Sequence, residues 1–289
     1  MLQDIYPHQF RNEYENKAPN DSDFVFVFKS GYILLKKIKS DPVFEIPRFE
    51  SFKNNPEIKK DALYLFSIDG AAYFLAGTEP SDEITEEKNT TEEVGYYSVR
   101  SSLNFEQGTL AFACVTAFHL AKWYDSRRFC GRCGKKTVHK EDERAVYCKK
   151  CHQTEYPKIS PVVIVGIKNG DEILLTKYTT AASEYRNYAL IAGFVEIGET
   201  LEEAIQREVL EEVGVHVKNM TYYKSQPWAM SESLLMGFFA DLDGDKSVRL
   251  EVRELSEAVW ISRKEIPEGD STMSLTWEMI EAFRSGKIE

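Results

Sequence analysis

The stretch GFVEIGETLEEAIQREVLEEVGV, residues 193–215, decides the fold of one half of the chain. Four apolar residues in it recur every four positions: Leu201, Ile205, Val209 and Val213. This spacing predicts a helix with one buried stripe. Gly193 and Gly214 stand at the two ends, where a special backbone angle or a close approach to another group is needed.

A second face of the same helix collects acidic side chains. Glu208, Glu211 and Glu212 are three and four positions apart, so their carboxylates crowd together and would destabilise an isolated helix. Arg207 can neutralise and orient Glu199 or Glu211. A hard cation such as Mg²⁺ or Mn²⁺ would turn the crowded carboxylates into a binding site. The alternative is a solvated acidic face, the usual state of a glutamate-rich helix.

The segment resembles the Nudix box, Gly-x5-Glu-x7-Arg-Glu-aliphatic-x-Glu-Glu-x-Gly-aliphatic, at all nine specified positions. The resemblance implies an α+β Nudix fold, a mixed sheet sandwiched between helices, and metal-dependent hydrolysis of a nucleoside diphosphate linked to another moiety. It implies that Glu208 and Glu212 are metal ligands and that Glu211 is a ligand or the base on the attacking water. Glu199 is then a supporting carboxylate, and Arg207 belongs to the same catalytic group.

Two Cys-x-x-Cys pairs, Cys130 with Cys133 and Cys148 with Cys151, precede this segment and are separated by fourteen residues. Four thiolates at this spacing can close a tetrahedron around Zn²⁺ and leave no open coordination position. The pattern therefore predicts a structural zinc, and a redox switch or catalytic metal is the alternative. The nearby histidines, His139 and His152, are not needed as ligands.

Ser225-Gln226-Pro227-Trp228 lies ten residues past the box. Together with a zinc ribbon directly before a Nudix domain, it resembles the NADH pyrophosphatase subfamily, whose hallmark is Ser-Gln-Pro-Trp-Pro-Phe-Pro-x-Ser. Ser233 matches the last position of the hallmark, whereas Ala229-Met230-Ser231 replace Pro-Phe-Pro and should leave the loop less rigid. The resemblance now covers nearly the whole chain. The departure leaves substrate preference more open than reaction type.

The same resemblance implies further contacts. Phe194 and Trp228 are candidates to stack on the base or nicotinamide ring, and Glu254 resembles an extra metal ligand beyond the box. The surface-charge alternative applies to Glu254, as it does to the looser matches Glu143 and Arg100. The full set of expected substrate contacts is Arg100, Glu143, Tyr156, Phe194, Gln226, Pro227, Trp228, Ala229, Met230, Ser231, Glu232, Ser233 and Thr276.

The rest of the chain gives the domain organisation. Apolar runs over residues 24–28, 32–35, 63–68 and 72–76 predict a small mixed or antiparallel sheet, and residues 105–124 have the spacing of a helix. Two strands over 161–167 and 172–176 are joined at Asn169-Gly170, a hairpin signal. We therefore expect an N-terminal α+β domain over residues 1–125, a zinc ribbon over 126–158 and a Nudix domain over 159–289.

Composition limits the class of partner. The 289 residues include 47 acidic and 36 basic ones, for a net charge of −11, so most of the surface should repel polyanions. A long nucleic acid track is disfavoured, while a single 5′ end can still bind. The first residues lack the pattern of a signal peptide, and no run of about 18 apolar residues occurs. A cytoplasmic protein with reduced cysteines and no membrane partner is expected.

The first functional reading is hydrolysis of NAD(H) to AMP and nicotinamide mononucleotide, with removal of NAD caps from RNA 5′ ends as an extension of the same chemistry. A broader hydrolase of ADP-ribose or dinucleoside polyphosphates is the alternative within this class. A non-catalytic nucleotide-sensing regulator is the alternative from another class, and loss of box carboxylates would favour it. None is lost. The subfamily resemblance also implies a homodimer.

Overall fold

The computed structural model describes residues 1–38, 43–77, 92–179, 188–268 and 273–288. The chain divides into two compact units, Leu2–Lys158 and Ile159–Glu289, the second of which also includes Met1. The three-domain division expected from the sequence stays a prediction. Within the described residues no helix has both the length and the apolar character required to cross a membrane.

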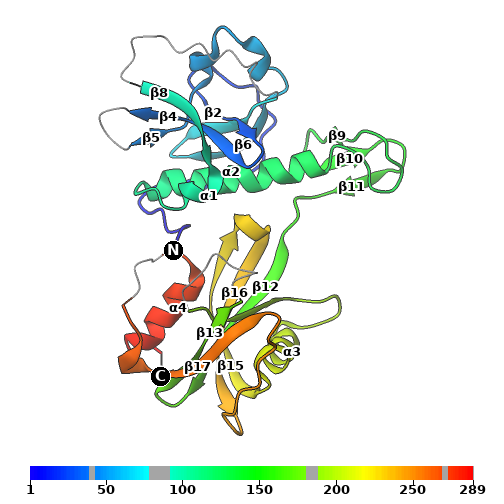
Figure 1. Cartoon of the computed structure of the whole chain (residues 1–289). Coiled ribbons are helices and arrows are strands. Elements are labelled where there is room, and N and C mark those ends of the chain that lie inside the picture. The colour runs from blue at the N-terminus through cyan, green and yellow to red at the C-terminus, as the bar shows by residue number, and fades with distance from the viewer. Residues whose placement is uncertain (39–42, 78–91, 180–187, 269–272, 289) are drawn as a thin grey trace. The chain divides into compact units, whose positions relative to one another are not determined.

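The N-terminal unit contains two four-stranded sheets in place of the single small sheet that we expected (Figure 1). The first has the order β1 (Phe10–Arg11), β6 (Leu63–Ile68), β7 (Ala71–Leu75), β2 (Phe24–Phe26), and only β2 and β7 run parallel. In the second, β4 (Tyr32–Ile38) pairs with β3 (Phe28–Lys29), β5 (Phe44–Glu45) and β8 (Glu92–Ser98), all antiparallel.

The prediction of one sheet was wrong because the apolar run of residues 24–28 is not one strand. It breaks at Val27, which is buried and accepts a hydrogen bond from the backbone N of Leu34 at 3.0 Å. The residues before Val27 pair with β7, and those after it pair with β4. A continuous apolar run therefore crosses from one sheet to the other.

One long helix supports this unit. α2 (Gly108–Ser126) follows a single turn, α1 (Val99–Ser102), and confirms the helix expected over residues 105–124. The Phe10 ring contacts Phe112 of α2 edge-on at 4.9 Å and Phe66 of β6 at 5.4 Å, so aromatic packing ties the helix to the first sheet. Two short 3-10 helices, η1 (Phe49–Phe52) and η2 (Pro56–Ile58), complete the unit's core.

A three-stranded antiparallel ribbon follows α2. Its order is β11 (Gln153–Glu155), β10 (Val146–Cys148), β9 (Val138–His139). Tyr124 near the end of α2 meets His139 edge-on at 5.2 Å. Arg144 donates to the carbonyl of Leu65 and, at 2.7 Å, to Oδ1 of Asn12. The ribbon is therefore fastened to the sheet and to the N-terminal segment of its own unit.

The C-terminal unit is built on a six-stranded mixed sheet. Its order is β15 (His216–Trp228), β16 (Ser233–Asp243), β12 (Ser160–Asn169), β13 (Glu172–Tyr178), β17 (Leu255–Ser262), with β14 (Ile191–Phe194) also paired to β12. β12 and β16 run parallel and the other pairs antiparallel. The expected hairpin is confirmed, since Asn169 pairs with Glu172 and Gly170 has a φ of 61°.

Helices cover both faces of this sheet, as the Nudix resemblance implied (Figure 1). Alternate residues of β12 point to opposite sides: Val163, Val165 and Ile167 pack with α3 (Leu201–Val213), whereas Val162 and Ile164 pack with α4 (Leu275–Arg284). Short 3-10 turns, η3 (Ala229–Ser231) and η4 (Arg263–Glu265), follow β15 and β17. The α+β fold class is confirmed.

Candidate active site

The box forms a helix that is fixed at both ends by its own residues. Thr200 caps the start of α3: its Oγ accepts from the backbone N of Glu203 at 3.2 Å, and the Glu203 carboxylate accepts from the backbone N of Thr200 at 2.8 Å. Gly214 ends the helix with a φ of 70°, in the left-handed region that favours glycine. The expected apolar stripe is buried against the sheet at Ile205, Val209 and Val213.

Arg207 organises the acidic groups around it. Its Nε donates to Oε1 of Glu199 at 2.5 Å, and its terminal nitrogens reach Glu199 Oε2 at 2.9 Å, Glu208 Oε1 at 2.7 Å and Glu211 Oε2 at 3.3 Å. A further bond to the carbonyl of Phe194, at 3.0 Å, ties this cluster to β14. The hydrogen bonds from Arg207 lower the pKa of Glu199 to about 2. Arg207 therefore forms ion pairs with both Glu199 and Glu211, the two partners that the sequence offered as alternatives.

Glu208 lies against the backbone of β14. A Cβ atom on Gly193 would come within 1.9 Å of Glu208 Cδ and 2.0 Å of Oε1. Position 193 must therefore be glycine for the carboxylate to keep its place. Burial raises the pKa of Glu208, although the bond to Arg207 opposes this change.

Glu212 is the most deeply buried carboxylate of the box. The residue is 4% exposed, and its Oε2 has no hydrogen-bond partner among the described residues. Burial, followed by the charges of Glu208, Glu254 and Glu211, raises its pKa to about 8. A buried carboxylate among like charges, with an unsatisfied oxygen, is unstable as an anion unless a cation joins it.

Two residues from outside the box lie near this cluster, one expected from the sequence and one not. The charge of Glu254 contributes to the raised pKa of Glu208 and Glu212, and the role of Glu254 as an extra metal ligand stays a prediction. Tyr178 of β13 is the residue that the sequence did not reveal. Burial raises its pKa to about 12, and the charges of Glu212, Glu254 and Glu208 add to this effect. Tyr178 follows a bulge in the β13–β17 pairing, and no motif marks that position.

The donor set fits a hard divalent cation. Glu208, Glu211, Glu212 and Glu254 offer carboxylate oxygens, the ligands that Mg²⁺ and Mn²⁺ prefer. The unpartnered Oε2 of Glu212 and the close approach of Gly193 to Glu208 both indicate a site arranged around these oxygens. Arg207 holds Glu208 and Glu211 through one nitrogen, so part of the cluster's charge is already neutralised by the chain itself.

Phe194 of β14 and Trp228 of β15, the two rings expected to stack on the substrate, lie at the same end of the sheet. Phe194 pairs with Val162, Val162 pairs with Leu235, and Trp228 pairs with Ser233. This register puts Phe194 and Trp228 on the α4 side of the sheet. Phe194 is 51% exposed, whereas Trp228 is half-buried against the α4 core.

The turn of this hairpin is ordered by its own polar groups. Ser231 and Ser233 share a hydroxyl hydrogen bond of 2.6 Å, and the carbonyl of Glu232 accepts from the backbone N of Ser160 at 2.8 Å. Ala229 and Ser233 are buried, Met230 and Glu232 are half-buried, and Pro227 and Ser231 are exposed. Glu232 has a φ of 54°, which closes the turn without the prolines of the common pattern.

Gln226 is fully buried and joins the hairpin to α4. Its Nε2 donates to the carbonyl of Met273 at 2.7 Å, and its Oε1 accepts from the backbone N of Leu275 at 2.7 Å. Thr276 follows in the first turn of α4 and is half-buried. Because both polar atoms of the Gln226 amide bond to backbone groups, we infer that Gln226 positions the hairpin against α4. A substrate contact by Gln226 or Thr276 stays a prediction.

Three expected contacts lie in the N-terminal unit. The structure brings two of them together, because the Tyr156 hydroxyl donates to Oε1 of Glu143 at 3.1 Å. Lys140 bonds to the same carboxylate, and Tyr156 is 58% exposed. Arg100 lies on α1, also exposed. Their contacts with substrate stay predictions.

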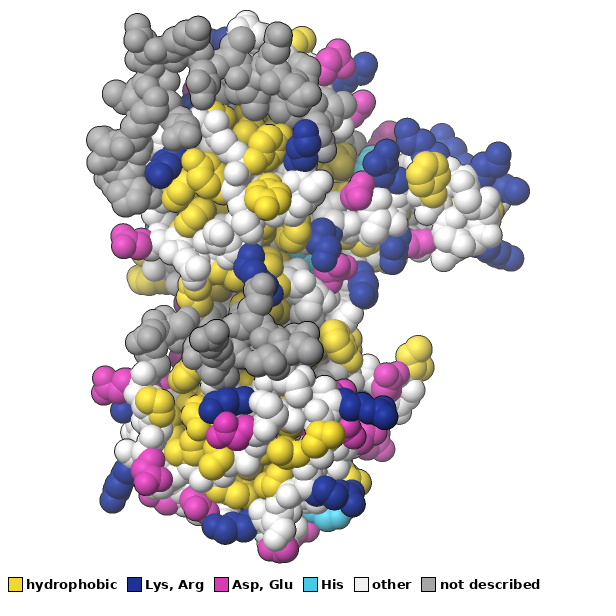
Figure 2. Space-filling view, viewed as in Figure 1, with side chains coloured by type: hydrophobic (Ala, Val, Ile, Leu, Met, Phe, Trp, Pro, Cys, Tyr) yellow, Lys and Arg dark blue, Asp and Glu magenta, His cyan; other side chains and the backbone are white. Residues whose placement is uncertain are grey.

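The four cysteines form the cluster that their spacing predicted. The sulfur atoms of Cys130, Cys133, Cys148 and Cys151 all lie within 4.8 Å of one another, which suits one metal ion. Each Cys-x-x-Cys turn closes alike: Gly134 N donates to the carbonyl of Cys130 at 2.9 Å, and His152 N donates to that of Cys148 at 2.8 Å. Figure 2 shows Lys and Arg side chains gathered over the ribbon that carries this cluster.

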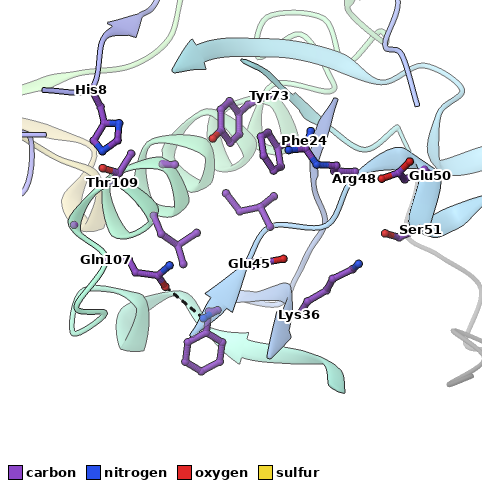
Figure 3. A pocket seen from close by; sticks show the side chains of 15 residues that line it. His8, Phe24, Lys36, Glu45, Arg48, Glu50, Ser51, Tyr73, Gln107 and Thr109 are labelled. Atoms are coloured by element: carbon purple, nitrogen blue, oxygen red, sulfur yellow. Dashed lines mark hydrogen bonds between the residues drawn. The ribbon is translucent and has the colours of Figure 1, made fainter. Parts of the chain in front are cut away.

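The N-terminal unit also contains a cavity of about 720 Å³ between its sheets and the start of α2 (Figure 3). Phe24 and Tyr73 stack in its wall at 4.7 Å, and Arg48 lies 3.9 Å from the centre of the Phe24 ring. Lys36 and Arg48 face Glu45 and Glu50 there, so the lining favours neither sign of charge. None of the expected site residues lines this cavity.

Comparison with known proteins agrees with both motifs. Residues 158–282 match the NUDIX domain, and residues 125–156 match the NADH pyrophosphatase zinc ribbon domain. The chain is 35% identical over 233 residues to a protein of Mannheimia succiniciproducens named NAD-capped RNA hydrolase NudC, covering 78% of this chain and 86% of that protein. A Yersinia pestis protein of the same name is 42% identical over 173 residues, covering 60% and 65% respectively.

Among solved structures, a NUDIX hydrolase from Nitrosomonas europaea aligns with 25% identity and a TM-score of 0.47 over 55% of this chain and 92% of that one. The chain contains both the zinc ribbon and the Nudix domain, and its similarity to the Mannheimia protein extends over both. The chain belongs to the Nudix hydrolase family, in the NADH pyrophosphatase group that carries this zinc ribbon.

Proposed function

We propose that the protein hydrolyses the diphosphate bond of NAD(H) to AMP and nicotinamide mononucleotide, and the same bond in NAD-capped RNA 5′ ends. The observation that carries the proposal is Glu212, a buried carboxylate with an unpartnered oxygen beside Glu208 and Glu254. Such a cluster suits a divalent cation and a diphosphate. The two relatives described above are named for NAD-capped RNA hydrolysis, which supports this choice of diphosphate.

Glu208, Glu211, Glu212 and Glu254 are the proposed ligands of catalytic Mg²⁺ or Mn²⁺. When bound, such a cation neutralises phosphate oxygens and lowers the pKa of a coordinated water. Glu211 is exposed, and its hydrogen bond to Arg207, at 3.3 Å, is the longest that Arg207 forms with a carboxylate of this cluster. We therefore assign to Glu211 the removal of the proton from the attacking water. Glu199 and Arg207 then hold Glu208 in place through their mutual hydrogen bonds.

Two rings are proposed to hold the substrate's flat groups. Phe194 is exposed at the end of β14, and Trp228 lies on the same side of the sheet. A dinucleotide stacked there would pass the end of β14, where neighbouring Gly193 faces the box carboxylates. Residues 227–233 would form the wall of this site, with Thr276 at the start of α4. Tyr156, Glu143 and Arg100 are proposed as contacts from the N-terminal unit.

Three further properties remain proposals. The cysteine cluster would bind a structural Zn²⁺, which the ribbon match and the closeness of the four sulfur atoms support. A homodimer is expected from the subfamily resemblance, and sedimentation of the purified chain would test it. The cytoplasmic location expected from the sequence is kept as a prediction.

A product analysis tests the proposed reaction. The purified chain is incubated with NADH, NAD⁺, ADP-ribose or NAD-capped RNA, with Mg²⁺ or Mn²⁺, and the products are separated. We expect AMP and the reduced mononucleotide from NADH, and a 5′-monophosphate RNA from the capped transcript. Rapid cleavage of ADP-ribose with neither NADH nor NAD⁺ cleaved would overturn the proposal in favour of a broader hydrolase. Binding without cleavage of any substrate would favour the regulator.

A further inference from the structure

The zinc ribbon carries a charge opposite to that of the whole chain. Residues 126–151 include nine Lys or Arg side chains and three acidic ones, although the full chain has a net charge of −11. The net charge led us to expect repulsion of a long RNA. The net charge of the whole chain does not show that acidic and basic side chains lie in different parts of the surface. Figure 2 shows basic side chains gathered on the ribbon.

Some of these basic groups are already engaged. Arg127 pairs with Glu155 at 2.7 Å, Arg128 with Asp125 at 3.2 Å, and Lys140 with Asp142 at 3.4 Å. Arg144 is used to fasten the ribbon to the first sheet. These four contribute little attraction for an outside partner, because their charges are matched or half-buried within the unit.

Five others form what we call the basic knuckle face: Arg132, Lys135, Lys136, Lys149 and Lys150. All five are exposed, and none forms an ion pair with any residue that the structure describes. Arg132 lies inside the first Cys-x-x-Cys turn and Lys149–Lys150 inside the second. The four sulfur atoms lie within 4.8 Å of one another, so the two turns that carry these cations lie side by side.

An exposed ring adjoins this face. Phe129 is 59% exposed, and its backbone forms a bridge with Lys136. A solvent-exposed phenylalanine next to several unpaired cations is the combination that binds single-stranded nucleic acid, since the cations meet phosphates and the ring stacks on a base. An acidic peptide would use the cations and leave the ring without a flat partner.

We propose that the basic knuckle face, together with Phe129, binds the single-stranded RNA that follows an NAD cap. This inference rests on the proposed function for its substrate class. The ribbon would then have a second role besides its structural one, because it would hold the RNA chain that follows the cap. The ribbon would then raise the affinity for NAD-capped RNA without changing the hydrolysis of free NADH.

Binding of RNA without a cap tests the face apart from the chemistry. The probe is an uncapped, fluorescent single-stranded RNA of about 12 nucleotides, a length within the range that one binding domain covers. The variant is Lys149→Gln/Lys150→Gln in the full chain. Its matched control is Lys53→Gln/Lys60→Gln, which removes two exposed lysines of the same unit outside the ribbon. Zinc content and melting temperature are measured for both.

We expect the ribbon variant to bind the RNA about tenfold more weakly than the control at low salt. The slope of log affinity against log salt should fall in magnitude by about 1.4, which is 0.7 for each lost phosphate contact. Phe129→Leu keeps apolar bulk and removes the ring. It should weaken binding by roughly fivefold or more and leave the salt slope unchanged. Equal affinity and equal salt slope in the ribbon variant and the control would overturn the proposal.

The two proposals fail separately. If the wild-type chain cleaves neither NADH nor NAD-capped RNA but binds uncapped RNA through these lysines, the proposed function is wrong and the face stands. If both substrates are cleaved and the ribbon variant has an unchanged KM for NAD-capped RNA, the face is wrong and the function stands. Binding to phosphatidylserine vesicles or to a poly-glutamate peptide, with no binding to the RNA, would also overturn the proposed partner.

Discussion

The backbone of Gly193 lies so close to the Glu208 carboxylate that no residue other than glycine fits at position 193. A Cβ atom at position 193 would lie 1.9 Å from Glu208 Cδ and 2.5 Å from Cγ. The φ of Gly193 is not in the left-handed region, so backbone freedom does not explain this glycine. Its role is the close approach of β14 to the box helix.

Gly193→Ala should therefore displace Glu208 without unfolding the unit. Because a shift of about 1 Å in a catalytic group can reduce turnover by about 10²-fold, we expect a loss of that order in kcat and a higher Mg²⁺ or Mn²⁺ requirement. The matched control is Gly108→Ala, where the new Cβ would meet nothing within 4 Å. Steady-state NADH hydrolysis over a range of metal concentrations gives the answer. Wild-type kinetics in Gly193→Ala would show that Glu208 can move freely.

Glu212→Gln removes a charge from the buried end of the carboxylate cluster and keeps the size of the side chain. We expect kcat/KM for NADH to fall by about 10²-fold or more, since a proposed metal ligand loses its charge. Glu202→Gln is the control, because Glu202 is exposed on the same helix and lies outside the four proposed ligands. Near-normal turnover in Glu212→Gln would remove the box helix from the mechanism.

The same substitution should stabilise the protein at high pH when Mg²⁺ and Mn²⁺ are omitted. The pKa of Glu212 rises from an ordinary 4.5 to about 8 in the folded state, so the folded chain holds this proton more tightly than the unfolded chain. Stability is therefore lost as the pH rises from about 4.5 to about 8, by at most about 5 kcal/mol. Glu212→Gln lacks this loss.

Urea unfolding at pH 5 and pH 9 measures the effect. The free energy of unfolding of Glu212→Gln should exceed that of the wild type at pH 9 and approach it at pH 5. Adding Mn²⁺ at pH 9 should stabilise the wild type more than the variant. An identical difference at both pH values would mean that Glu212 does not titrate between them.

Local patterns predicted the box helix well because its determinants are close in sequence. The apolar stripe, the Thr200 cap and the terminal Gly214 all act within one or two turns, and the structure has each of them. The hairpin at Asn169-Gly170 was predictable for the same reason. The cysteine cluster followed from ligand spacing alone.

Features that depend on distant pairing were not predictable. Val27 divides one apolar run between two sheets, and only the choice of partner strands, β7 and β4, decides this. Tyr178 reaches the carboxylate cluster through a bulge against β17, about 75 residues further along the chain. The Gln226 amide bonds to the backbone of Met273 and Leu275, at the start of α4, and no local pattern marks this pairing.

Gln226 yields a prediction about the hairpin. Gln226→Leu leaves the carbonyl of Met273 and the backbone N of Leu275 without this partner in the protein interior. We expect a loss of about 2–3 kcal/mol in the free energy of unfolding, because a buried N–H and a half-buried carbonyl lose their hydrogen bonds to Gln226. The KM for NADH should also rise, since Trp228 is two residues away. Gln206→Leu, at an exposed position of α3, is the control. A stable variant with an unchanged KM would contradict the positioning role.

The five cysteines should separate into four that hold zinc and one that does not react. Cys114 is fully buried in α2, and burial raises the pKa of its thiol, whereas the other four lie together on the ribbon. Titrating the folded protein with a mercurial should release one zinc per chain as four thiols react. Cys114 should react only after denaturant is added. Cys148→Ser should reduce the bound zinc and lower the melting temperature, and Cys114→Ala should leave the zinc content unchanged. Four reactive thiols with no zinc released would show that the ribbon is held together without metal.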